Sequence, residues 1–167
     1  MPRQGIMLCY PFDPRRLEKW GREAFIQLKL NGERCRAICF PNQIQMLSSE
    51  GNSIPFLSHI AEALMKLGLN GVELDGELYV HGFSLQDIHS IVSRKVNSHA
   101  LSAAIEYHIF DIVENDTQRN RFAALNVIDA RIRGLGPVSY THLRAHETPE
   151  HLVCRLLLEK KKQIQST

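Results

Sequence analysis

Two hydrophobic periodicities alternate along the chain and predict its secondary structure. Apolar residues at every second position, bounded by Gly, Asn or Ser, are typical of β-strands. This pattern predicts strands at 24–30, 34–40, 44–49 and 104–113. Another is predicted at 72–80, either as a pair of strands or as one bulged strand around Asp75-Gly76.

Apolar residues three or four positions apart predict helices at 13–24, 54–71, 84–95 and 117–132. Asp13 followed by Pro14 is a favourable helix start, and Ser84 is a favourable N-cap. Either Gly68 or Gly71 is expected to end the second helix, because glycine readily adopts the left-handed conformation that closes helices. From residue 24 onward the order is β-β-β-α-β-α-β-α, which predicts an α+β fold with mostly antiparallel pairing.

The stretch QLKLNGER, residues 27–34, joins the first two predicted strands. Asn-Gly between two alternating runs is the strongest short-range signal for a hairpin, because both residues tolerate a positive φ. We therefore expect these strands to pair through a turn at Asn31-Gly32. Such a turn would hold Lys29 rigidly at a strand end, which is compatible with a chemical role for its amine.

Composition is that of a globular domain with a sizeable core. The chain has 167 residues, of which 44% are hydrophobic. No apolar run approaches the roughly 20 residues that a membrane-crossing helix needs, and the N-terminus lacks a signal-peptide layout. The histidines show no metal-ligand spacing. The cysteines form no CxxC pair and are predicted to be reduced thiols of a cytosol-like compartment: Cys9, Cys35, Cys39 and Cys154.

The end of the chain differs from the rest. Residues 138–148 and 152–160 correspond, codon by codon and in one frame, to the translation of a transposon-type sequencing-library adapter. Residues 149–151 fall where such adapters carry a variable index. We therefore interpret 137–167 as adapter read-through, not a domain. This tail holds five of the 20 Lys/Arg and three of the 18 Asp/Glu, so residues 1–136 carry 15 of each. The basic end is no evidence for nucleic-acid binding.

Four short stretches that could carry chemistry stand in the order QLKLNGER, LSSEGNSI, LDGELYVHG and YHIFDIV. Each alone is weak evidence. Together they resemble the adenylation domain of ATP-dependent DNA ligases, in the covalent nucleotidyltransferase superfamily that also contains RNA ligases and mRNA-capping enzymes. The resemblance covers residues 7–130, and its motif positions are Lys29, Gly32 and Arg34, then Asp75-Gly76-Glu77, then Phe110-Asp111-Ile112.

This resemblance implies a fold and a reaction. The fold would be a partial ligase- or capping-type nucleotidyltransferase domain, residues 1–136, with mostly antiparallel sheets and flanking helices. Lys29 would attack the α-phosphate of ATP, release pyrophosphate and carry AMP. The AMP would then pass to the 5′-phosphate at a nick, where the 3′-hydroxyl displaces it. An amine attacks only when neutral, a form that burial or nearby positive charge favours.

The resemblance also implies the remaining site residues and partners. Gln27, on the same strand face as Lys29, would bond the adenine edge, and Phe110 would stack on the adenine. Arg34 would contact the nucleotide sugar or phosphate, and Glu77 the ribose or a metal-bound water. Mg²⁺ would offset the charge that develops during phosphoryl transfer, although no metal ligand is assigned. The partner would be nicked double-stranded DNA.

The parent enzyme would be a monomer without a membrane partner, in the cytoplasm of a bacterial or phage-infected cell, serving DNA repair, replication or recombination. Two positions depart from the family pattern: Asn31 replaces an Asp, and Ser49 stands where many members have Arg. The family's Glu-Gly-hydrophobic and Lys-x-Lys motifs and its OB-fold domain would lie beyond Gly136. We therefore expect the chain as written to seal no nicks and to adenylate poorly or not at all.

Two alternatives remain open at this point. Within the superfamily, the chain could derive from an RNA ligase or from a capping guanylyltransferase, which uses GTP. Outside it, the chain could be a non-catalytic α+β binding module whose KLNGER and LDGEL stretches are only hairpins.

The interpretation of the tail predicts the sequence of the source locus. Amplifying and resequencing across codon 136 should reveal a frame that continues into Glu-Gly-hydrophobic and Lys-x-Lys motifs. A locus that encodes VSYTHLRAHET at this point would show that the adapter interpretation is wrong.

Overall fold

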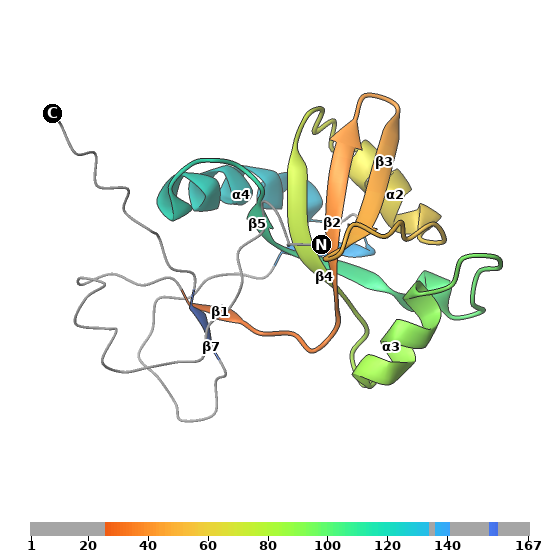
Figure 1. The fold of residues 1–167 in the computed structure, drawn as a ribbon. Coiled ribbons are helices and arrows are strands. Elements are labelled where there is room, and N and C mark those ends of the chain that lie inside the picture. The colour runs from red at the N-terminus through yellow and green to blue at the C-terminus, as the bar shows by residue number, and fades with distance from the viewer. Residues whose placement is uncertain (1–25, 134–135, 141–153, 157–167) are drawn as a thin grey trace, which may run out of the picture.

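The computed structural model describes residues 26–133, 136–140 and 154–156, and a five-stranded sheet forms its centre (Figure 1). The order across the sheet is β3-β2-β4-β5-β6. Its strands are Glu33–Phe40 (β2), Gln43–Ser48 (β3), Glu73–Tyr79 (β4), Glu106–Ile112 (β5) and Val138–Tyr140 (β6). All neighbours are antiparallel except β5 and β6. A separate two-stranded sheet pairs Ile26–Leu28 (β1) with Cys154–Leu156 (β7).

Three helices and one 3-10 turn pack around the sheet. They are Ser58–Met65 (α2), Leu85–Val92 (α3), Gln118–Ile132 (α4) and Ser102–Ala104 (η1). In the view of Figure 1, α2 and α4 lie behind the sheet, and α3 lies at its lower end. No helix in the described ranges is long and apolar enough to cross a membrane.

The core lies on one face of the sheet. Alternate residues of a strand share a face, so β2 turns Cys35, Ala37 and Cys39 toward the core. Burial raises the pKa of the Cys39 thiol to about 11 and raises that of the Cys35 thiol further. Both thiols therefore stay protonated at neutral pH and pack as small apolar side chains.

Most of the predicted elements are confirmed. The stretch 72–80 forms one strand, β4, not a pair, and the bulge opposite Asp75-Gly76 has its extra residue on β5. Ser84 caps α3 in a capping box with Asp87, and α4 spans most of 117–132. Helix α2 begins only at Ser58, and the stretch before it lies against β3, where the backbone N–H of Ile54 donates to the carbonyl oxygen of Met46 at 2.9 Å. The helix predicted at 13–24 lies outside the described residues.

The hairpin predicted at Asn31-Gly32 is wrong. Strand β1 pairs with β7, and β2 pairs with β3 through the two residues Pro41-Asn42 and with β4 on its other side. Neither Asn31 nor Gly32 has a positive φ. Glycine is needed at position 32 for space, since a Cβ there would lie 2.1 Å from the backbone oxygen of Leu78. Asn31-Gly32 therefore does not form a hairpin turn. Its glycine instead allows the backbone before β2 to pass close to Leu78 of β4.

Residues of the tail take part in this fold. The backbone N–H of Tyr107 donates to the carbonyl oxygen of Pro137 at 2.8 Å, and Val138 is 3% exposed within the core. Strand β6 therefore completes one edge of the sheet. The adapter origin of these codons stays a prediction.

Mutation can distinguish the steric requirement for glycine at Gly32 from the conformational preference for glycine at Gly71, which has a positive φ. Gly32→Ala should cost about 3 kcal/mol of unfolding free energy, because the methyl group meets a backbone atom that cannot move aside. Gly71→Ala, with a φ of 78° and open space around it, should cost only about 1 kcal/mol. Urea denaturation measures both. Equal costs would contradict the steric explanation.

Candidate nucleotide-binding site

A buried ion pair between β2 and β4 is the centre of the candidate site. Arg34 donates from Nε to Asp75 Oδ1 at 2.9 Å, and its Nη2 donates to Oδ2. The Asp75 side chain is 1% exposed and that of Arg34 is 11% exposed. Two parallel hydrogen bonds match the guanidinium fork to the carboxylate plane, which fixes both side chains in orientation as well as in distance.

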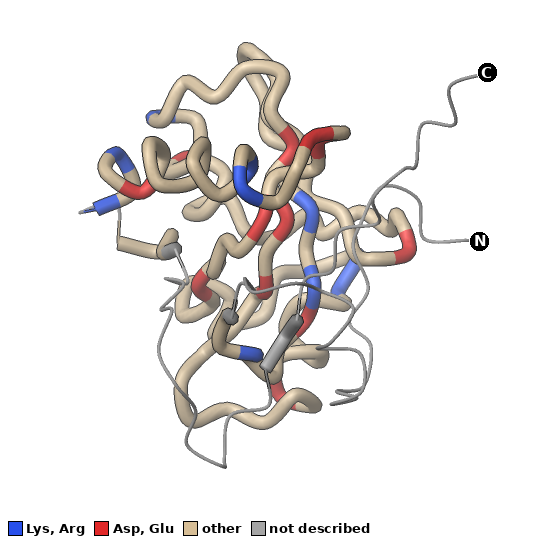
Figure 2. Tube along the Cα trace, turned by 90° about the vertical axis from the view of Figure 1, so that its left-hand side faces the viewer, with Lys and Arg blue, Asp and Glu red and all other residues tan. Residues whose placement is uncertain are grey.

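A second pair, Arg36 with Glu73, follows on the same face of the same two strands. Both of its side chains are 20% exposed, so water screens it more than it screens the first pair. Strands β2 and β4 are neighbours in the sheet. Figure 2 shows Lys/Arg and Asp/Glu positions close together in the middle of the molecule. The polar face of the sheet therefore carries two ion pairs between β2 and β4, and the Arg34–Asp75 pair is the more buried of the two.

Glu77 connects this face to the QLKLNGER stretch. Its side chain is buried and accepts a hydrogen bond from the backbone N–H of Gly32 at 3.3 Å. Arg34 lies directly opposite Glu77 in the strand register. Gly32, Arg34, Asp75 and Glu77, which come from two different motifs, therefore form one connected group.

Phe110 lies at the register shift between β4 and β5. Asp75 pairs with Asp111 and Gly76 pairs with Ile109, so Phe110 is the extra residue of a β-bulge. The bulge lets Ile109 and Ile112, three positions apart, both face the core. The aromatic ring of Phe110 is 5% exposed and lies 5.4 Å from the Arg34 guanidinium carbon. One face of the ring expected to stack on adenine is thus covered by Arg34 in this structure.

Gln27 holds the backbone of the bulge. Its Nε2 donates to the carbonyl oxygen of Phe110 at 2.8 Å, and the residue is 2% exposed. Its Oε1 is a buried acceptor without a hydrogen-bond partner in the described part of the chain. A buried acceptor of this kind is costly unless a ligand or water donor meets it.

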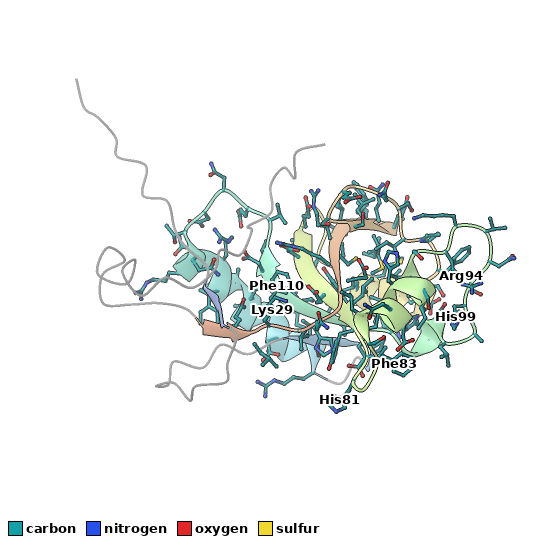
Figure 3. All side chains as sticks on the ribbon, turned by 60° about the horizontal axis from the view of Figure 1, so that its bottom comes forward. Lys29, His81, Phe83, Arg94, His99 and Phe110 are labelled. Carbon is teal, nitrogen blue, oxygen red and sulfur yellow. The ribbon has the colours of Figure 1, made fainter. Side chains whose placement is uncertain are left out.

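Lys29 follows β1 and has an exposed side chain. Figure 3 shows Lys29 and Phe110 in the same part of the molecule, away from the labelled side chains of His81, Phe83, Arg94 and His99 around α3. Ser49, by contrast, lies in the turn after β3, on the outer edge of the sheet and two strands from β4. The structure therefore groups Gln27, Arg34, Glu77 and Phe110 by contact and leaves Ser49 apart.

Two site features were missed by the sequence reasoning. Asp75 was matched to a motif without a role, yet it is the partner of Arg34. Asp111 accepts from Arg121 Nε at 2.9 Å, which anchors α4 to the end of β5 next to the bulge. Burial raises the pKa of Asp111, and the Arg121 hydrogen bond and charge oppose that shift. The sequence signal for either pair is an Asp next to apolar residues: Asp75 follows Leu74, and Asp111 lies between Phe110 and Ile112.

No group of three or more His, Cys, Asp or Glu side chains is arranged to hold a metal ion within the described ranges. Mg²⁺ is often bound through one or two carboxylates together with substrate phosphates. Arg34 holds both carboxylate oxygens of Asp75, so Glu77 is the motif carboxylate that fits binding of this kind.

Comparisons with protein-family models and with curated protein sequences gave no match. The fold, however, is that of the adenylation domain of ATP-dependent DNA ligases. The ligase of bacteriophage T7 in complex with ATP matches with a TM-score of 0.64 at 14% identity, over 82% of this chain and 54% of that one. The Chlorella virus DNA ligase-adenylate matches with a TM-score of 0.59 at 20% identity, over 84% and 50%.

A structure of the Lig E DNA ligases matches with a TM-score of 0.61 at 19% identity, over 87% of this chain and 53% of that one. The chain thus spans about half the length of these ligases. At these identities the likeness establishes the fold, and the α+β class expected from the sequence is confirmed. The chemistry has to be argued from the site.

The two charge pairs on this face should differ in their contribution to stability. Asp75→Asn should cost about 3 kcal/mol of unfolding free energy, because it leaves a buried guanidinium without its counter-charge. Glu73→Gln makes the same chemical change in the more exposed pair and should cost less than about 1 kcal/mol. Urea denaturation of both variants checks this, and equal costs would count against a buried Arg34–Asp75 pair.

Proposed function

We propose that this chain is part of an ATP-dependent DNA ligase and that its parent enzyme forms a lysine-AMP intermediate. The observation that carries the proposal is the grouping of Gln27, Phe110 and Arg34 by contact, with Glu77 opposite Arg34 in the register, on a sheet with the ligase adenylation fold. The buried Gln27 Oε1, which has no partner among the described residues, favours a ligand-binding site over a non-catalytic module.

Lys29 would supply the covalent step. Its Nζ lone pair would attack the α-phosphorus of ATP, forming a P–N bond as the bond to the β-phosphate oxygen breaks and pyrophosphate leaves with those electrons. The amine loses its proton in the process. Lysine suits this role because it can be neutral at the moment of attack, whereas arginine stays charged. Transfer of AMP to a 5′-phosphate at a nick, and its displacement by the 3′-hydroxyl, would follow.

The buried residues would recognise the nucleotide. Gln27 Nε2 donates to the Phe110 carbonyl, which leaves Gln27 Oε1 as the acceptor for a ligand. An acceptor at this position would suit the exocyclic amine of adenine. Stacking of adenine on Phe110 would require Arg34 to withdraw from one ring face, or adenine to use the other. A guanidinium has five N–H donors, so Arg34 can hold Asp75 and also meet a ribose or phosphate oxygen.

Mg²⁺ would supply charge stabilisation when it is bound with the ATP phosphates. Glu77 is the carboxylate that we assign to the ribose or to a metal-bound water, since Asp75 is held by Arg34. The partner of the parent enzyme would be nicked duplex DNA, bound by a monomer in the cytoplasm. We also propose that the 167-residue chain, which spans about half the length of the ligases it matches, seals no nicks by itself.

The test is nucleotide transfer to the protein expressed from the resequenced locus. Incubation with ATP and Mg²⁺ should add one adenylyl group, and peptide mass spectrometry should locate it on Lys29. Lys29→Arg should abolish the gain, while Lys66→Arg, a matched change at an exposed lysine next to α2, should not affect it. A gain with GTP in place of ATP would move the protein to the capping class, and no gain with either nucleotide would favour the binding module.

A further inference from the structure

Tyr107, on β5, is fully buried and bridges the two strands that carry the candidate site. Its hydroxyl lies 3.1 Å from the carbonyl oxygen of Cys35 in β2 and 3.1 Å from that of Leu74 in β4. The single O–H proton is shared between these two acceptors. Burial raises the pKa of the Tyr107 phenol well above its usual range, so the hydroxyl stays protonated and can donate at neutral pH.

The ring of Tyr107 also fills the space beneath Gly76. A Cβ at position 76 would lie 2.5 Å from Cε2 and 2.9 Å from Cζ of Tyr107, and 2.7 Å from the carbonyl oxygen of His108. The φ of Gly76 is not positive, so backbone conformation does not demand glycine there. The glycine between Asp75 and Glu77 is therefore explained by the ring and backbone packed against it.

The contact with Tyr107 lies where the sheet changes register. The hydroxyl reaches the carbonyl of Leu74, and the β4–β5 shift follows between Asp75 and Gly76. A bulge increases the local twist and re-aims the side chains on either side of it. The extra residue of this bulge is Phe110 on β5, and Asp75 of the facing strand β4 lies at the register shift. Asp75 and Glu77 bind Arg34 and Gly32 on the opposite face.

We propose that Tyr107 is a positioning residue for the candidate site. From the apolar face it ties β2 to β4 and fixes the strand twist at the bulge. This twist sets the direction in which Asp75 presents its carboxylate to Arg34. The consequence for nucleotide binding rests on the function proposed above, whereas the consequence for the Arg34–Asp75 pair does not.

The test uses Tyr107→Phe, which keeps the ring under Gly76 and removes only the hydroxyl. The matched control is Tyr79→Phe, because Tyr79 is on β4 and packs edge-on against His108 at 5.6 Å. The readout is the hydrogen-exchange rate of the Arg34 Nε–H group by NMR, assigned by its loss in Arg34→Lys. Tyr107→Phe should speed this exchange about five- to tenfold with a native circular dichroism spectrum. Tyr79→Phe should leave the rate unchanged.

A Tyr107→Phe chain that melts at a lower temperature but exchanges the Arg34 proton at the unmutated rate would overturn the proposal, since Tyr107 would then serve stability alone. If Tyr107→Phe does not fold, native-state hydrogen exchange of the unmutated chain tests the proposal instead. The Tyr107 hydroxyl and the Arg34 Nε–H group should then open in one event with the same denaturant dependence. Exchange of Arg34 through a separate, easier opening would overturn the proposal.

A titration with ATP, followed by the same Arg34 signal, separates this inference from the proposed function. Faster exchange in Tyr107→Phe together with no response to ATP in the unmutated chain would support the positioning role and count against nucleotide binding by this polypeptide. A response to ATP in the unmutated chain that Tyr107→Phe weakens and Tyr79→Phe preserves would support both.

Discussion

The close approach of β4 to its neighbours is the constraint on which the candidate site depends. At Gly32 the backbone of the connection into β2 comes so near to Leu78 that a side chain would overlap it, and at Gly76 the ring of Tyr107 occupies the corresponding space from below. Because the Asp75 side chain is only 1% exposed, its charge is stabilised by a protein group and not by bulk water. Arg34 meets it with two hydrogen bonds, and the rest of the polar face is arranged around that pair.

The bulge at Phe110 solves a conflict between the two faces of β5. The apolar face needs Tyr107, Ile109 and Ile112 in the core, which a regular period of two cannot provide. One extra residue restores the register, and it is this residue that is turned toward Arg34. The carbonyl group of Phe110 is taken by the side-chain amide of Gln27. The bulge in β5 therefore accounts for the position of the Phe110 ring next to Arg34 and for the orientation of the Gln27 amide.

The charged side chains of this domain act through individual ion pairs, not through a net charge. Residues 1–136 carry equal numbers of acidic and basic side chains, so no net field marks a partner. The charges that matter are paired across β2 and β4, and the pair nearest the bulge is the more buried. In the function proposed here, a nucleotide would meet a face whose donors and acceptors are already oriented, which reduces the reorganisation needed when it binds.

The sequence by itself determined most elements and the family resemblance, because periodicity and caps act over a few residues. The N-cap at Ser84 is a local signal of this kind and could be predicted. The position of the bulge on β5, at Phe110, depends on the pairing of β4 with β5 and could not be predicted. The pairing of β1 and the role of Gly32 could not, because Asn-Gly has the same local preference whether it forms a turn or passes under another strand. Which of these occurs depends on contacts with Leu78, 46 positions away in the sequence.

The site shows the same division. Lys29, Arg34, Glu77 and Phe110 could be identified as candidates from their motifs, since residue type and spacing are visible in the sequence. The partners that orient them could not: Asp75 for Arg34, the Phe110 carbonyl for Gln27, and Tyr107 beneath Gly76. Each of these contacts joins segments far apart in the chain, so only the packing of the sheet decides it. The sequence determined which groups are available for chemistry, and the tertiary structure decided how they are held.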